Sequence, residues 1–343
     1  MTTTARLTLT KIGEMAGVSR STVSRVINNQ GSVNPEIRER VERVIQETGY
    51  QPHPAARSLA GQKMHTIGLV IPQTAQILFT DPFFPHLIQG IAQACNRHDY
   101  TLSLFLMHAS NDEARVYQRL LQNPFFDGII LTADYIVDDL VPEMLKREIP
   151  FVHIGHHDHP DVSYVDADNI TGAYTAVSHL SRLGHKRIAT ITGPMNNLAA
   201  VHRQQGYLNA LRDRGHSVPP ELIATGDFSE AGGAAAMKQL LAHKPDSVFV
   251  ASDAMALGAL RALRKTDLSI PQDIAIVGYD DLPPAIHADP ALTTVRQPIK
   301  KAGSLAAEIL FDMVDNGRLP PRRIILPTEL VIRASCGVMF SKQ

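Results

Sequence analysis

The sequence has little of what exported, disulfide-stabilised or membrane-spanning proteins need. Its 343 residues include only two cysteines, Cys95 and Cys336, which are far apart and match neither a disulfide framework nor a zinc-finger spacing. Residues 1–30 contain no apolar segment typical of a secretory signal, and no run of about 18 apolar residues occurs anywhere. We therefore expect a cytoplasmic protein that makes no membrane contact.

The short motifs of common α/β enzymes are also absent. We find no glycine-rich dinucleotide loop, no phosphate-binding P-loop, no nucleophile elbow and no zinc-protease helix motif. These absences argue against an enzyme. A transport binding protein is a second alternative, but it would need an export signal and would have no use for residues 1–62.

The net charge of −1 conceals an uneven distribution. Residues 1–62 carry eight Lys or Arg against five Glu, whereas the remainder carries 25 basic and 29 acidic residues. This split indicates that contact with a polyanion, if any, is made at the N-terminal end. The length suits two or three folding units, and 44% hydrophobic residues are enough to bury a sizeable core.

Three regions separate along the chain. Residues 1–50 have the pattern of three short helices, residues 51–63 contain Pro52, Pro54 and Gly61 and resemble a linker, and from Thr66 onward apolar runs alternate with amphipathic stretches. Continuous apolar strands between helices indicate parallel sheets covered on both faces. Because there are too many such units for one sheet, we predict an α/β fold with two similar lobes and a ligand cleft where the carboxyl ends of the strands meet.

The expected elements of this body can be bounded from the pattern. The strands are Thr66–Ile71, Thr101–Met107, Gly128–Leu131, Phe151–Ile154, Ile188–Thr192, Ser247–Val250 and Ile274–Gly278. The helical stretches include Phe83–Asn96, Asn169–Leu183, Arg203–Arg214, Ala231–Ala242 and Asp253–Lys265. Asp253 is expected to cap the helix that begins beside it rather than to touch a ligand.

The N-terminal region has the pattern of a helix-turn-helix. Thr8 is a plausible N-cap for a helix Leu9–Ala16, Gly17 supplies a turn, and Ser19 caps a second helix, Arg20–Asn28. A third helix starts at Pro35, with Asn34 as its N-cap, and is stopped by Gly49.

The second helix carries the side chains that suit DNA. It is rich in hydroxyl and guanidinium groups, and Arg25 can pair bidentately with guanine while Arg20 and Ser21 sit at its leading end. Helix spacing alone is equally compatible with a surface helical hairpin that carries solvated charges.

The residues themselves decide between these two readings. Thr8–Ser19, Ser21–Asn28, Gly49–Pro52 and Ala55–Leu59 resemble the headpiece of the lactose-repressor (LacI/GalR) family of transcriptional regulators. The resemblance continues through the body, for example in Asp81–Phe84, Asp166–Asn169, Ala251–Gly258, Val277–Asp281 and Leu292–Pro298.

The resemblance implies an organisation and a function. It implies a three-helix headpiece over residues 1–50, a hinge linker over 51–63 with a hinge helix Pro54–Ala60, and a periplasmic-binding-protein-like body over 64–343, whose two lobes are linked by three crossovers. It also implies a repressor that binds operator DNA as a homodimer and responds to a small effector, for which a sugar is favoured over a nucleobase, with no cofactor. A dual activator and repressor remains an alternative.

Carried over residue by residue, the family pattern gives DNA-contacting positions. Leu59 matches an apolar wedge that opens a base step in the minor groove. The full set is Thr10, Ser19, Arg20, Ser21, Thr22, Ser24, Arg25, Asn28, Ala56 and Leu59.

The same reasoning gives candidate effector contacts. Asp280 follows a strand and can accept hydrogen bonds from a sugar diol. Phe84 and Phe228 could stack on the apolar face of a sugar or on a flat base. Arg203 could equally be a structural residue of its lobe. The set is Asp81, Phe84, Thr132, His156, Arg203, Phe228, Ser252 and Asp280, with Gln297 as a further polar candidate.

Three further features bear on these expectations. Val201 stands where some sugar-binding members carry an arginine, so a lactose-type effector is not implied. The histidines of residues 153–159 invite a metal interpretation, but adjacent histidines do not converge on one ion without a tight turn, and we expect no metal. No heptad tail follows the last strand-like run, Leu330–Arg333, which favours dimers over tetramers.

Overall fold

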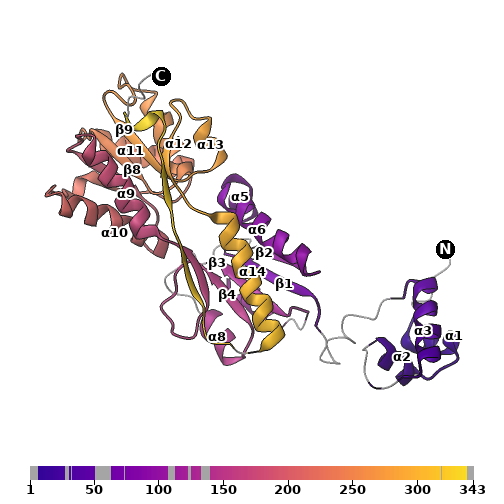
Figure 1. Cartoon of the computed structure of the whole chain (residues 1–343). Coiled ribbons are helices and arrows are strands. Elements are labelled where there is room, and N and C mark those ends of the chain that lie inside the picture. Colours follow the sequence, from indigo (N-terminus) through magenta and orange to yellow (C-terminus); the bar gives the residue numbers. More distant parts are fainter. Residues whose placement is uncertain are drawn as a thin grey trace, which may run out of the picture. The chain divides into compact units, whose positions relative to one another are not determined.

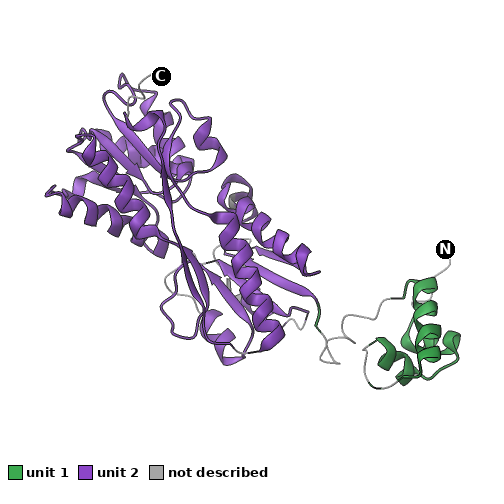
Figure 2. Cartoon of the chain, in the orientation of Figure 1, with its two compact units in different colours: residues 1–64 green, residues 65–343 purple. Residues whose placement is uncertain are grey.

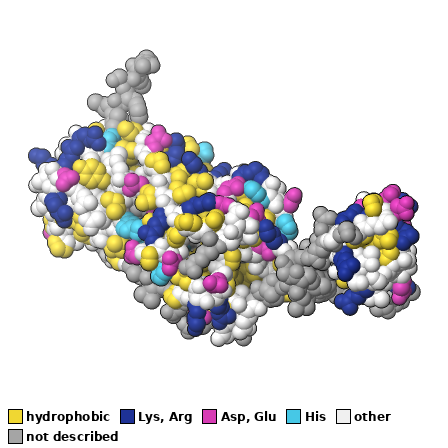
Figure 3. Space-filling view, turned by 60° about the horizontal axis from the view of Figure 1, so that its bottom comes forward, with side chains coloured by type: hydrophobic (Ala, Val, Ile, Leu, Met, Phe, Trp, Pro, Cys, Tyr) yellow, Lys and Arg dark blue, Asp and Glu magenta, His cyan; other side chains and the backbone are white. Residues whose placement is uncertain are grey.

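The computed structural model describes residues 7–27, 31, 33–50, 63–72, 74–106, 113–122, 125–132, 140–317 and 319–337. The chain divides into two compact units, residues 1–64 and residues 65–343 (Figure 2). On the face drawn in Figure 3, acidic and basic side chains are interspersed over both units. The expected hinge helix, with Ala56 and Leu59, lies outside the described residues, as does Asn28.

The smaller unit is a bundle of three helices, α1 (Leu9–Ala16), α2 (Arg20–Ile27) and α3 (Pro35–Thr48). The predicted caps are confirmed: Thr8 Oγ1 accepts a hydrogen bond from the Lys11 amide at 3.3 Å, and Asn34 Oδ1 accepts one from the Glu36 amide at 2.8 Å. Gly17 and Gly49 end their helices with φ of 65° and 61°, which glycine adopts without strain. The three helices bury a common core of Ile12, Ala16, Val23, Val26, Val41, Val44 and Tyr50.

The larger unit contains two mainly parallel sheets, one in each lobe (Figure 1). In the first lobe the described strands are β1 (Thr66–Ile71), β2 (Thr101–Leu106), β3 (Gly128–Thr132), β4 (Phe151–Ile154), β5 (Tyr164–Ala167) and β11 (Arg323–Leu326). In the second lobe they are β6 (Ile188–Thr192), β7 (Ile223–Thr225), β8 (Ser247–Val250), β9 (Ala275–Asp280), β10 (Thr293–Arg296) and β12 (Glu329–Val331).

The order of strands shows how the chain passes between the lobes. The first sheet runs β11-β5-β4-β3-β1-β2 and the second β12-β10-β9-β8-β6-β7, and only the β10–β12 pair is antiparallel among the described pairs. Since β5, β10 and β11 are each followed by an element of the other lobe, the described chain crosses three times, as the family resemblance implies. The last crossing is the extended ribbon of β11 and β12 that runs between the lobes in Figure 1.

Helices cover both faces of each sheet, as continuous apolar strands require. The first lobe has α5 (Ala75–Thr80), α6 (Phe83–Arg97), α7 (Glu113–Leu121), α8 (Leu140–Lys146) and α14 (Ile299–Asn316). The second has α9 (Asn169–Arg182), α10 (Leu198–Asp213), α11 (Glu230–Leu241), α12 (Asp253–Leu263) and α13 (Pro283–Ile286). Among the described residues, no helix combines the length and apolar character needed to cross a membrane.

Most expected strands appear with their predicted bounds, but two differences affect the site. The helix expected at Arg203–Arg214 begins earlier, at Leu198, because Asn197 Oδ1 accepts a hydrogen bond from the Ala200 amide. The strand expected to end at Gly278 continues to Asp280, which pairs with Arg296 of β10. Arg203 therefore lies within a helix, and Asp280 is the last residue of a strand.

The first lobe depends on close packing between α6 and α14. A Cβ added at Gly90 would lie 2.0 Å from the Lys300 carbonyl oxygen, and backbone cannot yield as a side chain can. We expect Gly90→Ala to destabilise the larger unit by about 1–3 kcal/mol, the usual range for overpacking. Denaturant unfolding followed by circular dichroism measures this change. Gln89→Ala, on the exposed side of the same helix, is the matched control; equal stabilities of the two variants would show that the helices can separate freely.

Candidate functional site

The second helix of the smaller unit presents the predicted polar side chains. Ser19 Oγ accepts a hydrogen bond from the Thr22 amide at 3.1 Å and lies 2.8 Å from the hydroxyls of Ser21 and Thr22, so this serine caps α2 as expected. Val23 and Val26 point into the core, which leaves Arg20, Ser21 and Arg25 exposed. Ser24 and Thr22 are half-buried, and Thr10 is exposed on α1.

The turn between α1 and α2 is tightly packed. A Cβ at Gly13 would lie 2.8 Å from the Val18 carbonyl oxygen, and the Val18 amide donates to the Gly13 carbonyl oxygen at 2.9 Å. This contact fixes the second helix against the first. A rigid helix with a polar, exposed leading end and no carboxylate of its own suits the major groove of DNA.

The larger unit contains a cavity of about 890 Å³, open to solvent, which residues of both lobes line. It lies at the carboxyl ends of the strands, where ligands of such sheets are bound. The first lobe contributes residues such as Thr132 at the end of β3 and Asp166 on β5, and the second contributes Arg203 on α10 and Asp280 on β9. The crossovers contribute as well: Gln297 and Pro298 follow β10, and Asn169 begins the helix that follows the crossing from β5.

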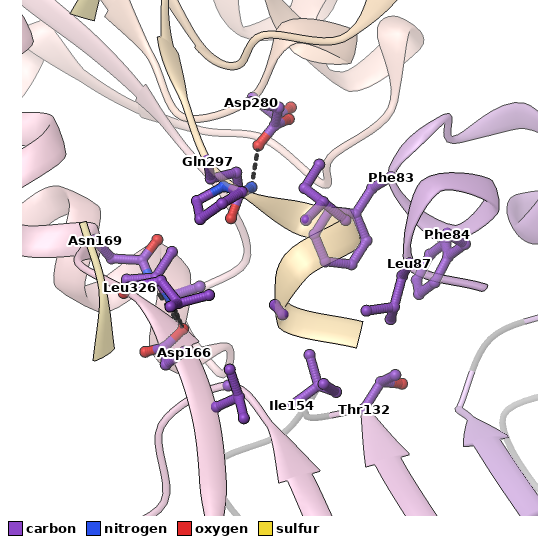
Figure 4. Close-up of a pocket in the computed structure, with 18 of the residues that line it drawn as sticks. Phe83, Phe84, Leu87, Thr132, Ile154, Asp166, Asn169, Asp280, Gln297 and Leu326 are labelled. Atoms are coloured by element: carbon purple, nitrogen blue, oxygen red, sulfur yellow. Dashed lines mark hydrogen bonds between the residues drawn. The ribbon is translucent and has the colours of Figure 1, made fainter. Parts of the chain in front are cut away.

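One wall of the cavity is a hydrogen-bonded polar cluster (Figure 4). Gln297 Nε2 donates to Asp280 Oδ1 at 2.6 Å, and Arg203 Nη1 lies 3.6 Å from the same oxygen. Arg203 also donates to Asn169 Oδ1 at 2.8 Å and to the Ala251 carbonyl oxygen at 2.5 Å, and its guanidinium lies 3.8 Å from the centroid of the Tyr279 ring. These contacts hold the Arg203 side chain in place within the second lobe, and the residue also lines the cavity.

The opposite wall is mainly apolar, with Asp81 and Thr132 as its polar members. Figure 4 shows Phe83, Phe84, Leu87 and Ile154 across the cavity from Asp280 and Gln297. Thr132 lies on this side, and its hydroxyl donates to the Val70 carbonyl oxygen at 3.2 Å. A cavity with one polar and one apolar wall fits a ligand that has the same two faces.

Burial sets the protonation of the cavity carboxyls. It raises the pKa of Asp280 to about 7, an effect that Asp81 strengthens and that Arg203 and Gln297 oppose. It raises the pKa of Asp166 to about 6, and it also raises the pKa of Asp81. Asp280 and Asp166 consequently change charge close to neutral pH.

Asp280 is also held in an unusual backbone conformation. Its φ is 123° and that of Asp281 is 57°, both in the left-handed region that residues with a Cβ rarely adopt. Asp281 is anchored there by Arg296 at 2.7 Å and Arg333 at 2.5 Å. A strained carboxylate that neighbouring ion pairs hold in place is typical of a binding site.

The sequence-predicted effector residues fall into two groups. Lining the cavity are Asp81, Phe84, Thr132, Arg203, Phe228, Ser252 and Asp280. His156 is not among the lining residues; its ring lies 5.0 Å from that of Tyr164 and 5.2 Å from that of His202. Whether these residues bind an effector stays a prediction.

The expectation for Asp253 was wrong in one respect. The N-cap of α12 is Ser252, whose Oγ accepts a hydrogen bond from the Met255 amide, and Asp253 is the first residue of the helix. Its carboxyl is buried and accepts hydrogen bonds from the Thr294 hydroxyl at 2.6 Å and the Leu282 amide at 2.9 Å. It does not line the cavity, so its side chain serves the second lobe internally.

Three polar residues of the cavity escaped the sequence-based candidate list. Asp166 and Asn169 lie within a motif shared with the family, and Asn197 caps the helix that carries Arg203. The sequence signal that could have found them is their position at strand ends and helix starts. For Asn197 this signal was hidden, because the helix was expected to begin at Arg203 rather than at Leu198.

The described residues contain no group of three or more His, Cys, Asp or Glu side chains arranged to hold a metal ion. The histidines after β4 instead bond locally. His153 Nδ1 lies 3.0 Å from the Gly155 carbonyl oxygen, and His156 Nε2 lies 3.0 Å from Asp158 Oδ1. Burial lowers the pKa of His153 to about 4, so this ring is neutral.

Two family models match the chain. Residues 8–53 match the bacterial regulatory proteins of the lacI family, and residues 177–336 match a periplasmic binding protein-like domain. Together they cover the helix-turn-helix unit and most of the second lobe.

Full-length relatives and solved structures agree with both models. The regulator CelR of Thermobifida fusca is 40% identical, covering 96% of this chain and 98% of its own, and the ribose operon repressor of Escherichia coli K12 is 36% identical, covering 96% and 99%. A solved CelR–cellobiose complex superposes with a TM-score of 0.76 at 38% identity, covering 96% of this chain and 100% of that one. The lac repressor dimer bound to operator and an anti-inducer reaches 0.82 at 28% identity, covering 96% and 99%. By its helix-turn-helix unit, its two-lobed fold and these relatives, the chain belongs to the LacI family of bacterial transcriptional regulators.

Proposed function

We propose that this protein is a cytoplasmic repressor that binds operator DNA through residues 1–50 and releases or engages it in response to a sugar held between the two lobes of residues 64–343, with residues 51–63 as the hinge. The cavity carries this proposal: hydrogen-bonding groups around Asp280 face an apolar wall that includes Phe83 and Phe84.

A sugar ring matches both walls. Its hydroxyls require acceptors and donors, and Asp280, Asp166 and Gln297 offer both, while its C–H face packs against aromatic rings. The relatives support this class, because CelR has been solved with cellobiose and a LacI-family regulator of Enterococcus faecium with bound ribose. Phe84, Thr132, Phe228 and Ser252 would complete the contacts.

A nucleobase is the second candidate, because the aromatic rings that line the cavity could also stack on a flat heterocycle. Calorimetry of the full chain against neutral sugars, sugar phosphates and nucleobases separates these classes. Binding of a nucleobase with no response to any sugar would replace the sugar proposal.

The operator is proposed to be a near-palindrome read by a homodimer, with one headpiece in each half-site. The solved lac repressor dimer with operator supports this arrangement. Effector and DNA then influence each other only through their differential affinity for two arrangements of the lobes. No bond is made or broken, and no cofactor is needed.

The first prediction for this function concerns base reading. Arg25→Ala should weaken operator binding by about 1–3 kcal/mol and relax specificity at one base pair, because a bidentate contact to guanine is lost. Fluorescence anisotropy with an enriched operator and a random duplex measures both effects. Arg43→Ala, an exposed arginine on α3 paired with Glu39, is the control and should bind like wild type. Equal losses on operator and random DNA would reduce Arg25 to a phosphate contact.

A second prediction concerns the effector. Asp280→Asn should abolish release or capture of DNA by the effector, since the amide replaces one of the two acceptor oxygens that face a diol with a donor, while DNA binding without effector stays near normal. Titrating cellobiose and ribose into the protein–operator complex tests this. Asp161→Asn removes an exposed carboxylate outside the cavity and is the matched control. A normal effector response in Asp280→Asn would show that the site is misplaced.

The raised pKa of Asp280 gives a third prediction. The folded-state pKa of about 7 exceeds the ordinary value of 3.8, so between these limits the folded state binds more protons. The stability of the larger unit should therefore fall as pH rises from 5 to 8. Asp280→Asn removes this group, and its stability should depend less on pH over the same interval. Urea titrations at several pH values compare the slopes; parallel slopes would mean that Asp280 is not buried with a raised pKa.

A further inference from the structure

Two histidine rings meet across the cleft, outside the cavity itself. His156 lies in the loop after β4 in the first lobe, and His202 lies on α10 in the second. Their ring centroids are 5.2 Å apart, with the planes at 74°. Neither residue is among those that line the cavity. The pair is therefore a direct contact between the lobes whose charge depends on pH.

The groups that surround the pair are mostly acidic or neutral. Asp158 bonds to His156 at 3.0 Å, and the ring of Tyr164 on β5 lies 5.0 Å from that of His156. The other titratable or charged groups that act on this neighbourhood are His153 on β4, His157 in the same loop, Asp166 on β5, Arg203 on α10 and Arg323 on β11.

Asp158 Oδ1 lies 3.0 Å from His156 Nε2. Burial, followed by the charge of His156, lowers the pKa of His202. Asp158 opposes this lowering only in part. If the lobes separate, His202 regains water and its ordinary value near 6.5. The arrangement with the rings in contact therefore holds fewer protons than the separated one, and acid favours separation.

We propose that His156 and His202 form a pH-sensitive latch: as neutral rings they hold the lobes together, and when both are protonated they push the lobes apart. The latch would make the response to effector weaker in acid. Only this consequence rests on the proposed function; the movement of the lobes does not.

The cleft carboxyls act in the opposite direction. Asp81 belongs to the first lobe and Asp280 to the second, and the charge of Asp81 raises the pKa of Asp280. Their protonation in acid relieves repulsion across the cleft and favours closure. The latch is therefore isolated by comparing variants at the same pH, since the carboxyl contribution is common to all of them.

Distance between the lobes can be read directly in the full-length protein without effector. Cysteines replacing Lys146 on α8 and Lys238 on α11 place dyes on exposed helices of the two lobes, and the native Cys95 and Cys336 are buried. Labelled protein is mixed with excess unlabelled protein so that energy transfer reports one chain. Transfer is recorded at pH 7.5 and 5.5 for wild type, His202→Phe and His202→Gln.

His202→Phe keeps a ring on α10 but cannot take a proton. At pH 5.5, the ratio of closed to open molecules should be at least about threefold higher in His202→Phe and His202→Gln than in wild type, after each is normalised to its own ratio at pH 7.5. His243→Gln, an exposed histidine elsewhere in the second lobe, should follow wild type. If both His202 variants show the wild-type pH dependence, the latch does not exist. Because no effector is added, absence of sugar binding would leave this result unaffected.

Discussion

The buried carboxylate of Asp280 is the constraint on which the larger unit depends. An ionised carboxylate away from water is tolerated only when its oxygens are paired. Its partners come from separate elements: Arg203 from α10, Gln297 from the crossover after β10, and the Asp253 amide, 3.4 Å away, from α12. A left-handed backbone of this kind costs on the order of 1–3 kcal/mol, which the surrounding bonds must offset. The strained backbone thus coincides with the carboxyl that lines the cavity.

Two further acidic residues of the second lobe, Asp253 and Asp281, lie next to Asp280. Asp253 is buried next to it, and burial together with the charge of Asp280 raises the pKa of Asp253. Thr294 and Leu282 satisfy its oxygens, while Asp281 is fixed by Arg296 and Arg333. Three neighbouring acidic groups thus have three different tasks. Asp253 is occupied by hydrogen bonds within the lobe, and Asp281 is occupied by ion pairs. Of the three, only Asp280 lines the cavity.

Local pattern was sufficient for many of the elements and for the location of the candidate cavity. Caps such as Thr8 and Asn34, and strands such as Phe151–Ile154, follow from neighbouring residues, and strand ends indicate where polar side chains gather. What the pattern could not reveal depends on contacts distant in sequence. The pairing of β11 with β5, the engagement of Arg203 by Asn169, and the position of His156 beside His202 arise only when the chain crosses between lobes. The role of Asp253 was missed because Ser252 competes for the same cap.

In the proposed function, one side chain would link the ligand to movement of the lobes. Only Gln297 and Pro298 separate β10 from α14, so this crossover must bend when the lobes move. Gln297 donates to Oδ1 of Asp280, the carboxyl that we propose contacts the ligand. A ligand that shares or displaces this hydrogen bond would change the free energy of the crossover segment. It would also change the free energy of its own binding. Differential affinity of this kind is all that coupling between two sites requires, and it needs no rearrangement within either lobe.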